Sequence, residues 1–274
     1  MGLSQRLLAL VSLGASAVAF APRRLNIPSG QAARLQSAAL KASVEDKDKV
    51  EVTEYFNNEG FDRWNRIYSA SEDVNNVQLD IRTGHDQTIA KVLKWVDEDG
   101  DAAGQTFCDA GCGVGSLAIP LAQRGAEVSA SDISDAMVSE ASRRAEGVLP
   151  AEAFSKMNFK TADLESLSGA YDTVTCIDVM IHYPSERMQD MVSKLGSVSN
   201  NRLIISFAPK TFFFQALKTI GSLFPGPSKA TRAYLHAEED VKAALANAGF
   251  KIKREEFTST SFYFSRLYEA VRES

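Results

Sequence analysis

A glycine-rich loop between a short apolar segment and a helix-forming segment is the feature that most constrains the fold. The loop is Asp109-Ala110-Gly111-Cys112-Gly113-Val114-Gly115-Ser116, and Asp132 ends the next alternating segment. Glycines allow a tight turn and a close approach of the backbone to a ligand, and the following helix start offers free N–H groups. This order predicts a nucleoside-binding site in which Asp132 accepts the ribose hydroxyls. The alternative is a set of glycines that serve only a turn.

Hydrophobic periodicity predicts an α/β chain. We expect strands at 106–110, 127–132, 158–163, 171–178, 202–208, 251–258 and 262–271, and helices at 74–96, 116–124, 134–147, 184–199 and 238–248. Such alternation is typical of a Rossmann-like, mostly parallel sheet with helices on both faces. The last two strands are close enough for an antiparallel hairpin. We expect a helical arm or lid at 43–104 and a ligand-binding domain at 105–274, with a substrate-covering insertion at about 209–236.

The first 42 residues have the pattern of a targeting sequence. A basic start precedes a fourteen-residue stretch, Leu7–Phe20, that is apolar and rich in small residues and holds a small-residue cleavage pattern at Ala17–Ala19. That apolar run is shorter than the roughly 20 residues of a membrane span. The Arg-, Ser- and Ala-rich stretch that follows resembles a chloroplast transit peptide, and the two in series resemble an algal bipartite plastid presequence. We therefore expect a plastid protein of the stroma or the membrane periphery; an ordinary secretory signal is the alternative.

Charge and cysteine content exclude several classes of protein. The formal net charge is −5, and residues 1–44 hold five basic and no acidic residues, which leaves 25 basic against 35 acidic residues in the remainder. Residues 45–274 are therefore acidic overall, and an acidic surface binds the negatively charged backbone of nucleic acid poorly. Three cysteines form no disulfide framework. Cys108 and Cys176 fall in expected core strands, and Cys112 reads as a small residue packed under the glycine loop rather than as a nucleophile.

The spacing Gly-x-Gly-x-Gly after an acidic residue resembles the first motif of class I S-adenosylmethionine methyltransferases. In that family the loop lies under the methionine part of the cofactor, and acids after the second and third strands hold the ribose and the adenine. The resemblance implies a seven-stranded sheet with a C-terminal antiparallel hairpin. It also implies a set of cofactor-binding residues: Asp109, Gly111, Gly113, Gly115, Asp132, Ile133, Met137, Asp163, Leu164 and Asp178. A nicotinamide dehydrogenase is the competing interpretation.

Residues after the fourth strand are expected to face the substrate, because ligands lie at the carboxyl ends of parallel strands. His182 and Tyr183 stand there. Tyr68, in the N-terminal arm, is expected to reach the same site if the arm covers the cofactor. In the insertion, Lys229 and Arg232 are candidates for pairing with substrate carboxylates. For each of these residues, ordinary packing or a solvated charge is the alternative.

Several further stretches resemble the magnesium-protoporphyrin IX methyltransferases of chlorophyll synthesis. They are Glu54–Asn57, Gly60–Trp64, Val77–Arg82, Asp109–Pro120, Ser129–Ser134, Asp163–Leu167, Ile181–Pro184, Ser206–Lys210 and Phe224–Tyr234, and the resemblance covers about residues 50–272. It implies methyl transfer from S-adenosylmethionine to a propionate carboxylate of the magnesium porphyrin. Magnesium would then arrive with the substrate, and no protein-held metal is expected. The pathway further implies the porphyrin-binding subunit of magnesium chelatase as a partner.

The implied chemistry needs no strong base, because a propionic acid is already ionised at neutral pH. Catalysis is then a matter of aligning the carboxylate with the methyl group and of excluding water. We expect His182 and Tyr68 to orient the carboxylate. Two other classes stay open: a methyltransferase for another apolar plastid metabolite, such as a quinone, and a non-catalytic protein that only binds the cofactor.

Overall fold

The computed structural model describes residues 49–69, 71–100, 102–211 and 233–273. All of them belong to one compact unit, Asp46–Ser274. The expected presequence, and Lys229 and Arg232 of the insertion, lie outside the described residues. None of the helices in the described ranges is long and apolar enough to cross a membrane.

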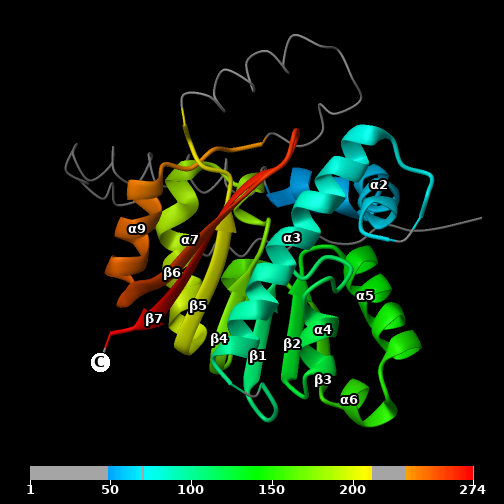
Figure 1. The fold of residues 1–274 in the computed structure, drawn as a ribbon, viewed down its shortest axis with the longest axis horizontal. Coiled ribbons are helices and arrows are strands. Elements are labelled where there is room, and N and C mark those ends of the chain that lie inside the picture. Colours follow the sequence, from blue (N-terminus) through cyan, green and yellow to red (C-terminus); the bar gives the residue numbers. More distant parts are fainter. Residues whose placement is uncertain (1–48, 70, 101, 212–232, 274) are drawn as a thin grey trace, which may run out of the picture. The chain divides into compact units, whose positions relative to one another are not determined.

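A seven-stranded sheet with the order β3-β2-β1-β4-β5-β7-β6 organises the unit (Figure 1). The first five strands are parallel, and β7 is antiparallel to both of its neighbours, β5 and β6. This confirms the expected seven-stranded sheet with a C-terminal antiparallel hairpin. The strands are β1 Thr106–Ala110, β2 Glu127–Asp132, β3 Met157–Thr161, β4 Tyr171–Cys176, β5 Ser199–Phe207, β6 Phe250–Ser259 and β7 Phe264–Arg272.

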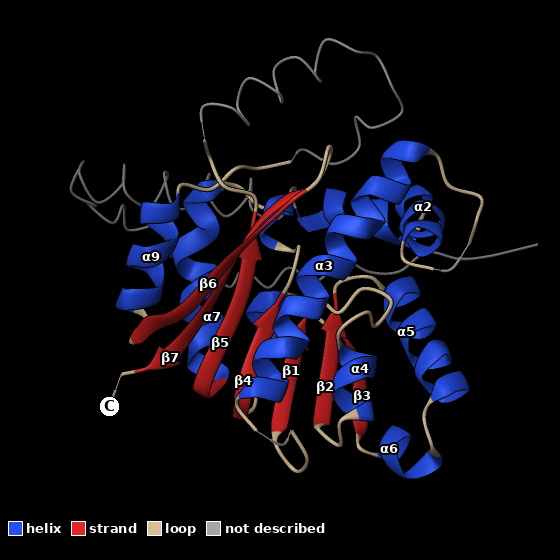
Figure 2. Ribbon diagram, in the orientation of Figure 1, coloured by secondary structure: helices blue, strands red, loops and turns tan. Residues whose placement is uncertain are grey.

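Helices cover both faces of the sheet (Figure 2). Buried residues of α3, α4 and α5 pack in one apolar cluster with Phe107 and Val128, and those of α7 and α9 pack in a second cluster with Val174 and Leu203. The helices are α2 Glu59–Ile67, α3 Asn76–Glu98, α4 Ala118–Gln123, α5 Asp135–Val148, α6 Ala151–Ser155, α7 Met188–Val198 and α9 Glu238–Asn247, and residues 49–57 are also helical.

Local sequence explains where the longest helices begin. The Asn75 side chain accepts a hydrogen bond from the Gln78 amide, and the Gln78 side chain bonds back to the Asn75 amide, which forms a capping box at the start of α3. Ser134 caps α5 through the Met137 amide, as the sequence predicts. Both helices are thus anchored at the end that lies next to the carboxyl edge of the sheet.

Several expected element bounds differ from the structure, and two of these differences lie in the segment between β4 and α7. The fourth strand stops at Cys176 rather than at Asp178, because Asp178 has a φ of 60°, which no strand residue adopts. The helix expected from Pro184 starts as a 3₁₀ turn at Ser185–Arg187, and the α-helix begins at Met188. Both of these differences fall in a loop at the carboxyl edge of the sheet, where a ligand would bind.

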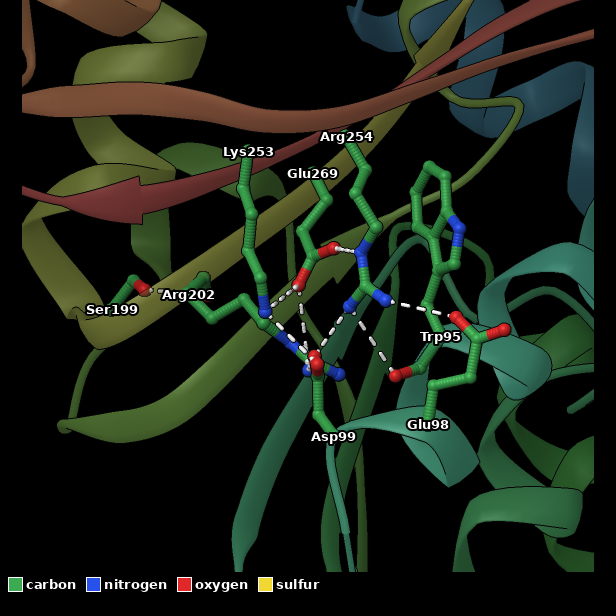
Figure 3. Close-up of polar contacts among 8 residues, drawn as sticks. All are labelled: Trp95, Glu98, Asp99, Ser199, Arg202, Lys253, Arg254 and Glu269. Atoms are coloured by element: carbon green, nitrogen blue, oxygen red, sulfur yellow. Dashed lines mark hydrogen bonds and ion pairs between the residues drawn. The ribbon is translucent and has the colours of Figure 1, made fainter.

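A cluster of ion pairs joins α3 to the antiparallel part of the sheet (Figure 3). Glu269 on β7 is fully buried and pairs with Arg254, with Arg202 at 3.5 Å and with Lys253 at 3.8 Å. Asp99, directly after α3, pairs with the same three basic residues. Because these charges come from α3, β5, β6 and β7, the cluster holds α3 against the sheet.

Candidate functional site

A cavity lies at the carboxyl edge of the parallel strands and brings together most of the residues predicted from the sequence. Its lining includes Tyr68, Asp109, Gly111, Gly113, Asp132, Ile133, Met137, Asp163, Leu164, Asp178, His182 and Tyr183. Gly115 is not among the lining residues, because it packs against Ile119 and Ala141 under the loop. The arm contributes Phe56 and Trp64, and the C-terminal hairpin contributes Phe262 and Tyr263.

The glycine loop needs its glycines for two different reasons. Gly111 has a φ of 81°, and a Cβ atom there would lie 2.1 Å from Cγ2 of Val179. Gly113 has a φ of 51°, and a Cβ atom there would meet open space. Gly111 therefore permits close packing between the loops after β1 and β4. The open side of Gly113 leaves room for a ligand to approach the backbone.

Asp132 links the end of β2 to the glycine loop. Its Oδ2 accepts the Gly113 amide at 3.0 Å, and its Oδ1 accepts the Ser134 amide at 2.9 Å. Burial raises the pKa of Asp132, although the amide hydrogen bonds oppose this shift. Each carboxylate oxygen has a second lone pair, so Asp132 can still accept the two hydroxyl groups of a ribose.

Asp109 is buried at the end of β1, next to the loop. Its Oδ1 accepts the Thr175 hydroxyl at 2.8 Å, whereas its Oδ2 has no hydrogen-bond partner among the described residues. Burial raises the pKa of this carboxyl to about 6. A buried acceptor of this kind fits a cationic donor, such as the ammonium group of a methionine moiety.

Asp163 follows β3 and forms an ion pair with Lys49 of the arm. Its Oδ1 accepts the Ser166 amide at 2.7 Å, and its Oδ2 lies 3.3 Å from the Lys49 ammonium. Burial acts to raise the pKa of Asp163, but the Ser166 and Lys49 interactions outweigh it and lower the pKa. Lys49 also pairs with Glu165, so the start of the described arm is bound to the loop after β3.

Asp178, after β4, accepts more hydrogen bonds than the other acids of the cavity. His85 Nδ1 lies 2.8 Å from its Oδ2, the Tyr263 hydroxyl lies 2.9 and 3.0 Å from its two oxygens, and the Ser206 hydroxyl donates at 3.0 Å. Burial acts to raise its pKa, but these donors prevail and the pKa is lowered. Asp178 is therefore an ionised carboxylate whose contacts lie within the protein, which agrees with a role in shaping the pocket.

His182 and Tyr68 both lie in the cavity, and burial shifts the pKa of each side chain. Burial lowers the pKa of His182 to about 4, and its Nδ1 has no hydrogen-bond partner among the described residues. Burial and the nearby Asp178 raise the pKa of Tyr68 well above its ordinary value. Near neutral pH the site therefore holds an uncharged imidazole and a phenol, both able to hydrogen-bond a ligand.

The arm that carries Tyr68 is fastened to α5 at two points. The Asn57 side chain accepts hydrogen bonds from the Ser134 hydroxyl at 2.9 Å and from the Ala136 amide at 3.2 Å. Arg144 donates to the Tyr68 carbonyl oxygen at 2.6 Å and to Oδ1 of Asn65 at 2.5 Å. The helix that follows Asp132 thus holds the arm over the cavity.

Two residues of the site, His85 and Tyr263, were not predicted. His85 lies four residues after Ile81 and four before Ile89, on the buried stripe of α3, so a polar residue on an apolar stripe was an available signal. Tyr263 comes from the turn between β6 and β7, and its place depends on β7 pairing with β5. No local pattern marks such a residue.

The cysteines behave as predicted. All three are free and buried. Burial raises the pKa of Cys112 well above its ordinary value, and it raises that of Cys108 to about 12. A thiol in such surroundings stays protonated, so the structure favours packing over nucleophilic chemistry for these residues.

Comparison with known proteins points to one family. A model described as the magnesium-protoporphyrin IX methyltransferase C-terminus matches residues 176–272, and a methyltransferase domain model matches residues 107–201. The chain is 56% identical over 224 residues to the chloroplastic magnesium protoporphyrin IX methyltransferase of Arabidopsis thaliana, covering 82% of this chain and 71% of that protein. It is 55% identical to the Synechocystis magnesium-protoporphyrin O-methyltransferase, covering 82% of this chain and 96% of that protein.

A solved structure agrees with the sequence comparison. The crystal structure of magnesium protoporphyrin IX methyltransferase from Synechocystis PCC 6803 with bound S-adenosylhomocysteine matches with a TM-score of 0.77 and 53% identity, covering 82% of this chain and all of that one. The same protein was also solved with bound S-adenosylmethionine. The chain therefore belongs to the magnesium-protoporphyrin IX methyltransferase family and has its class I, S-adenosylmethionine-dependent methyltransferase fold.

Proposed function

We propose that this chain methylates a propionate carboxylate of magnesium protoporphyrin IX with S-adenosylmethionine, giving the monomethyl ester and S-adenosylhomocysteine in chlorophyll biosynthesis. Membership of the family carries this proposal. The cavity adds an independent argument. Asp109, Asp132 and Asp163 lie at or just after the ends of three adjacent strands, where their carboxyl groups can accept hydrogen bonds from a nucleoside with a cationic side chain.

The cofactor would be held along the carboxyl edge of the sheet. Asp132 would accept the ribose hydroxyls, Asp163 and Leu164 would border the adenine, and the buried Oδ2 of Asp109 would accept the ammonium group. When bound, S-adenosylmethionine supplies an electrophilic methyl group on its sulfonium centre. The open side of Gly113 supports this placement, because a side chain there would occupy the ligand's path.

The protein's part in the reaction would be alignment and exclusion of water. The attacking carboxylate is already ionised, so no side chain has to remove a proton from it. His182 stays neutral near pH 7, and Tyr68 stays protonated, so both can orient the carboxylate by hydrogen bonds without transferring charge. The aromatic arm residues Phe56, Trp64 and Tyr68 cover the cavity and would lower its water content.

A plastid location is part of the same proposal. The Arabidopsis relative is named as chloroplastic, and the presequence pattern of residues 1–42 is independent of the site. The magnesium chelatase subunit is proposed as a partner because the pathway implies a hand-over of the porphyrin. Fusion of residues 1–60 to a fluorescent protein would test the location, and import into plastids is the expected result.

A methyl-transfer assay tests the proposed function directly. The chain is incubated with S-adenosylmethionine and either magnesium protoporphyrin IX or metal-free protoporphyrin IX, and the ester is measured by chromatography. Ester formation with the magnesium porphyrin is expected, together with little or none from the metal-free compound. Cofactor binding without ester from either porphyrin would contradict the substrate assignment and leave the methyltransferase fold intact.

A further inference from the structure

The His85 imidazole carries a buried polar atom that the protein itself does not satisfy. The side chain is 8% exposed and lines the cavity. Its Nδ1 is bonded to Asp178, whereas its Nε2 has no hydrogen-bond partner among the described residues. A buried nitrogen without a partner is unfavourable. Its position in the cavity therefore indicates that Nε2 is meant for a ligand.

The contacts of Asp178 determine which proton His85 carries. Asp178 is an ionised carboxylate that also accepts hydrogen bonds from Tyr263 and Ser206. A carboxylate only accepts, so His85 Nδ1 must be the donor in the contact at 2.8 Å. Nε2 is then an acceptor in a neutral ring and a donor in an imidazolium.

Two neighbours hold the His85 ring in place. The Asp178 carboxylate lies in direct hydrogen-bond contact with the ring. On the ring face, the Tyr68 ring centroid lies 4.3 Å away at an interplanar angle of 33°. The carboxylate fixes the orientation of the imidazole, and the Tyr68 ring packs against its face. His182, the other histidine of the cavity, has no bonded carboxylate among the described residues, and its aromatic neighbour Phe56 meets it edge-on, with ring centroids 5.1 Å apart at an interplanar angle of 81°.

The charges of the described lining residues and of the proposed reactants indicate which ligand group His85 Nε2 would meet. The described lining residues include four carboxylates, Asp109, Asp132, Asp163 and Asp178, and neither lysine nor arginine. Both proposed reactants bring a carboxylate into this acidic space: the methionine moiety of the cofactor and the propionate of the porphyrin. Among the described lining residues, His85 is placed to meet such a carboxylate through Nε2.

We propose that His85 binds a carboxylate group of one of the two reactants through Nε2–H, while its Nδ1–H stays bonded to Asp178. This inference rests on the proposed function, since that function names both sources of the carboxylate. Asp178 is then a positioning residue that acts through His85. Tyr263 and Ser206 keep the Asp178 carboxylate in place. This role also explains why a non-glycine residue is held at a φ of 60°.

The variant His85→Gln tests the proposal, with Thr83→Ala as its matched control. Thr83 is an exposed residue on the same helix and does not line the cavity. The full chain is used, and two quantities are measured: the Kd of S-adenosylmethionine by calorimetry and the KM of magnesium protoporphyrin IX. We expect one of them to rise about tenfold or more, as for the loss of a charge-assisted hydrogen bond. The control should change neither by more than about twofold.

Two analogues distinguish the sources of the carboxylate. Decarboxylated S-adenosylmethionine keeps the ammonium group and lacks the carboxylate, and the magnesium porphyrin dimethyl ester lacks both free propionates. If His85 binds the cofactor carboxylate, His85→Gln does not weaken binding of the decarboxylated cofactor. If it binds the propionate, the variant does not weaken inhibition by the dimethyl ester. Equal weakening of intact and decarboxylated cofactor would overturn the proposal, because Nε2 would then accept from the ammonium.

Asp178→Asn is the second variant, and asparagine tolerates the left-handed backbone conformation at this position. It should weaken the same binding step as His85→Gln, and the double variant should bind no more weakly than His85→Gln alone. Kd and KM within twofold of wild type in a folded His85→Gln or Asp178→Asn protein would overturn the proposal. A wild-type chain that binds the cofactor and forms no ester would contradict the proposed function instead.

Discussion

The Gly113 amide donates to the Asp132 carboxylate at 3.0 Å, so the acid expected to bind the ribose also shapes the glycine loop. Removing this carboxylate therefore removes a ligand contact and a loop contact together. We expect Asp132→Ala to raise the Kd of S-adenosylmethionine by more than about tenfold. Calorimetry measures this directly. An unchanged Kd would exclude Asp132 from the cofactor site.

The lowered pKa of His182 predicts a specific pH dependence of stability. Its pKa is about 4 in the folded chain and about 6.5 in the unfolded chain. Between these values the unfolded state binds more protons at this residue, so its contribution to stability falls as the pH falls from about 6.5 to about 4. His182→Gln removes this contribution.

Urea unfolding of wild type and His182→Gln at pH 7 and pH 5 tests the prediction. The wild type should lose stability relative to the variant on going to pH 5. Comparing the two proteins cancels the opposite effect of Asp109, whose pKa is raised to about 6. A difference in unfolding free energy that does not change with pH would show that His182 is not a buried neutral histidine.

Adjacent arginines on α5 give a matched test of the arm. Arg144 bonds the Tyr68 carbonyl and Asn65, whereas Arg143 is exposed and pairs only with Glu140 among the described contacts. We expect Arg144→Ala to lower kcat/KM for the porphyrin about fivefold or more, because Tyr68 loses its anchor. Arg143→Ala should stay within twofold. Equal effects of the two substitutions would show that the arm does not depend on this contact.

Alanine substitutions at two helical glycines, Gly84 and Gly147, should affect the stability of the chain differently. At Gly84 on α3 an added Cβ would lie 2.3 Å from a ring carbon of Tyr263, whereas at the exposed Gly147 on α5 it would meet nothing within 4 Å. We expect Gly84→Ala to destabilise the chain by about 1–3 kcal/mol through overpacking. Gly147→Ala should be neutral or stabilising by up to about 1 kcal/mol. Thermal unfolding measures both, and a stabilised Gly84→Ala would contradict the close approach of Tyr263.

Loss of the buried Glu269 carboxylate should lower the free energy of unfolding more than loss of an exposed charge in the same region. Glu269→Gln leaves Arg202, Lys253 and Arg254 without their buried partner, and we expect a loss of about 3 kcal/mol or more. Lys94→Ala, which removes an exposed pair with Glu98 on the same helix, should cost less than about 1 kcal/mol. Urea unfolding compares the two variants. Similar losses of unfolding free energy would show that the ion pairs of Glu269 stabilise the fold no more than an exposed pair does.

Much of the fold could be predicted because its signals are local. The glycine loop, the Ser134 cap and the acid at the end of β2 lie within one strand–helix–strand unit, and the structure confirms each. The positions of His85 and Tyr263 could not be predicted, because they depend on how α3 and β7 pack on distant strands. The β1 and β2 strand ends border the side of the cavity proposed for the cofactor, whereas the polar network around Asp178 is assembled from three regions far apart in sequence.

The insertion of β7 between β5 and β6 has a consequence for synthesis of the chain. β5 is complete at Phe207, yet its outer edge pairs with residues 264–272, the last strand to leave the ribosome. Until then β5 offers an unpaired edge of buried apolar residues, such as Leu203 and Ile205, to any other chain. The nascent protein is therefore open to strand-mediated aggregation until residues 264–272 are made. Assembly of the site to which Tyr263 belongs must therefore wait for β7.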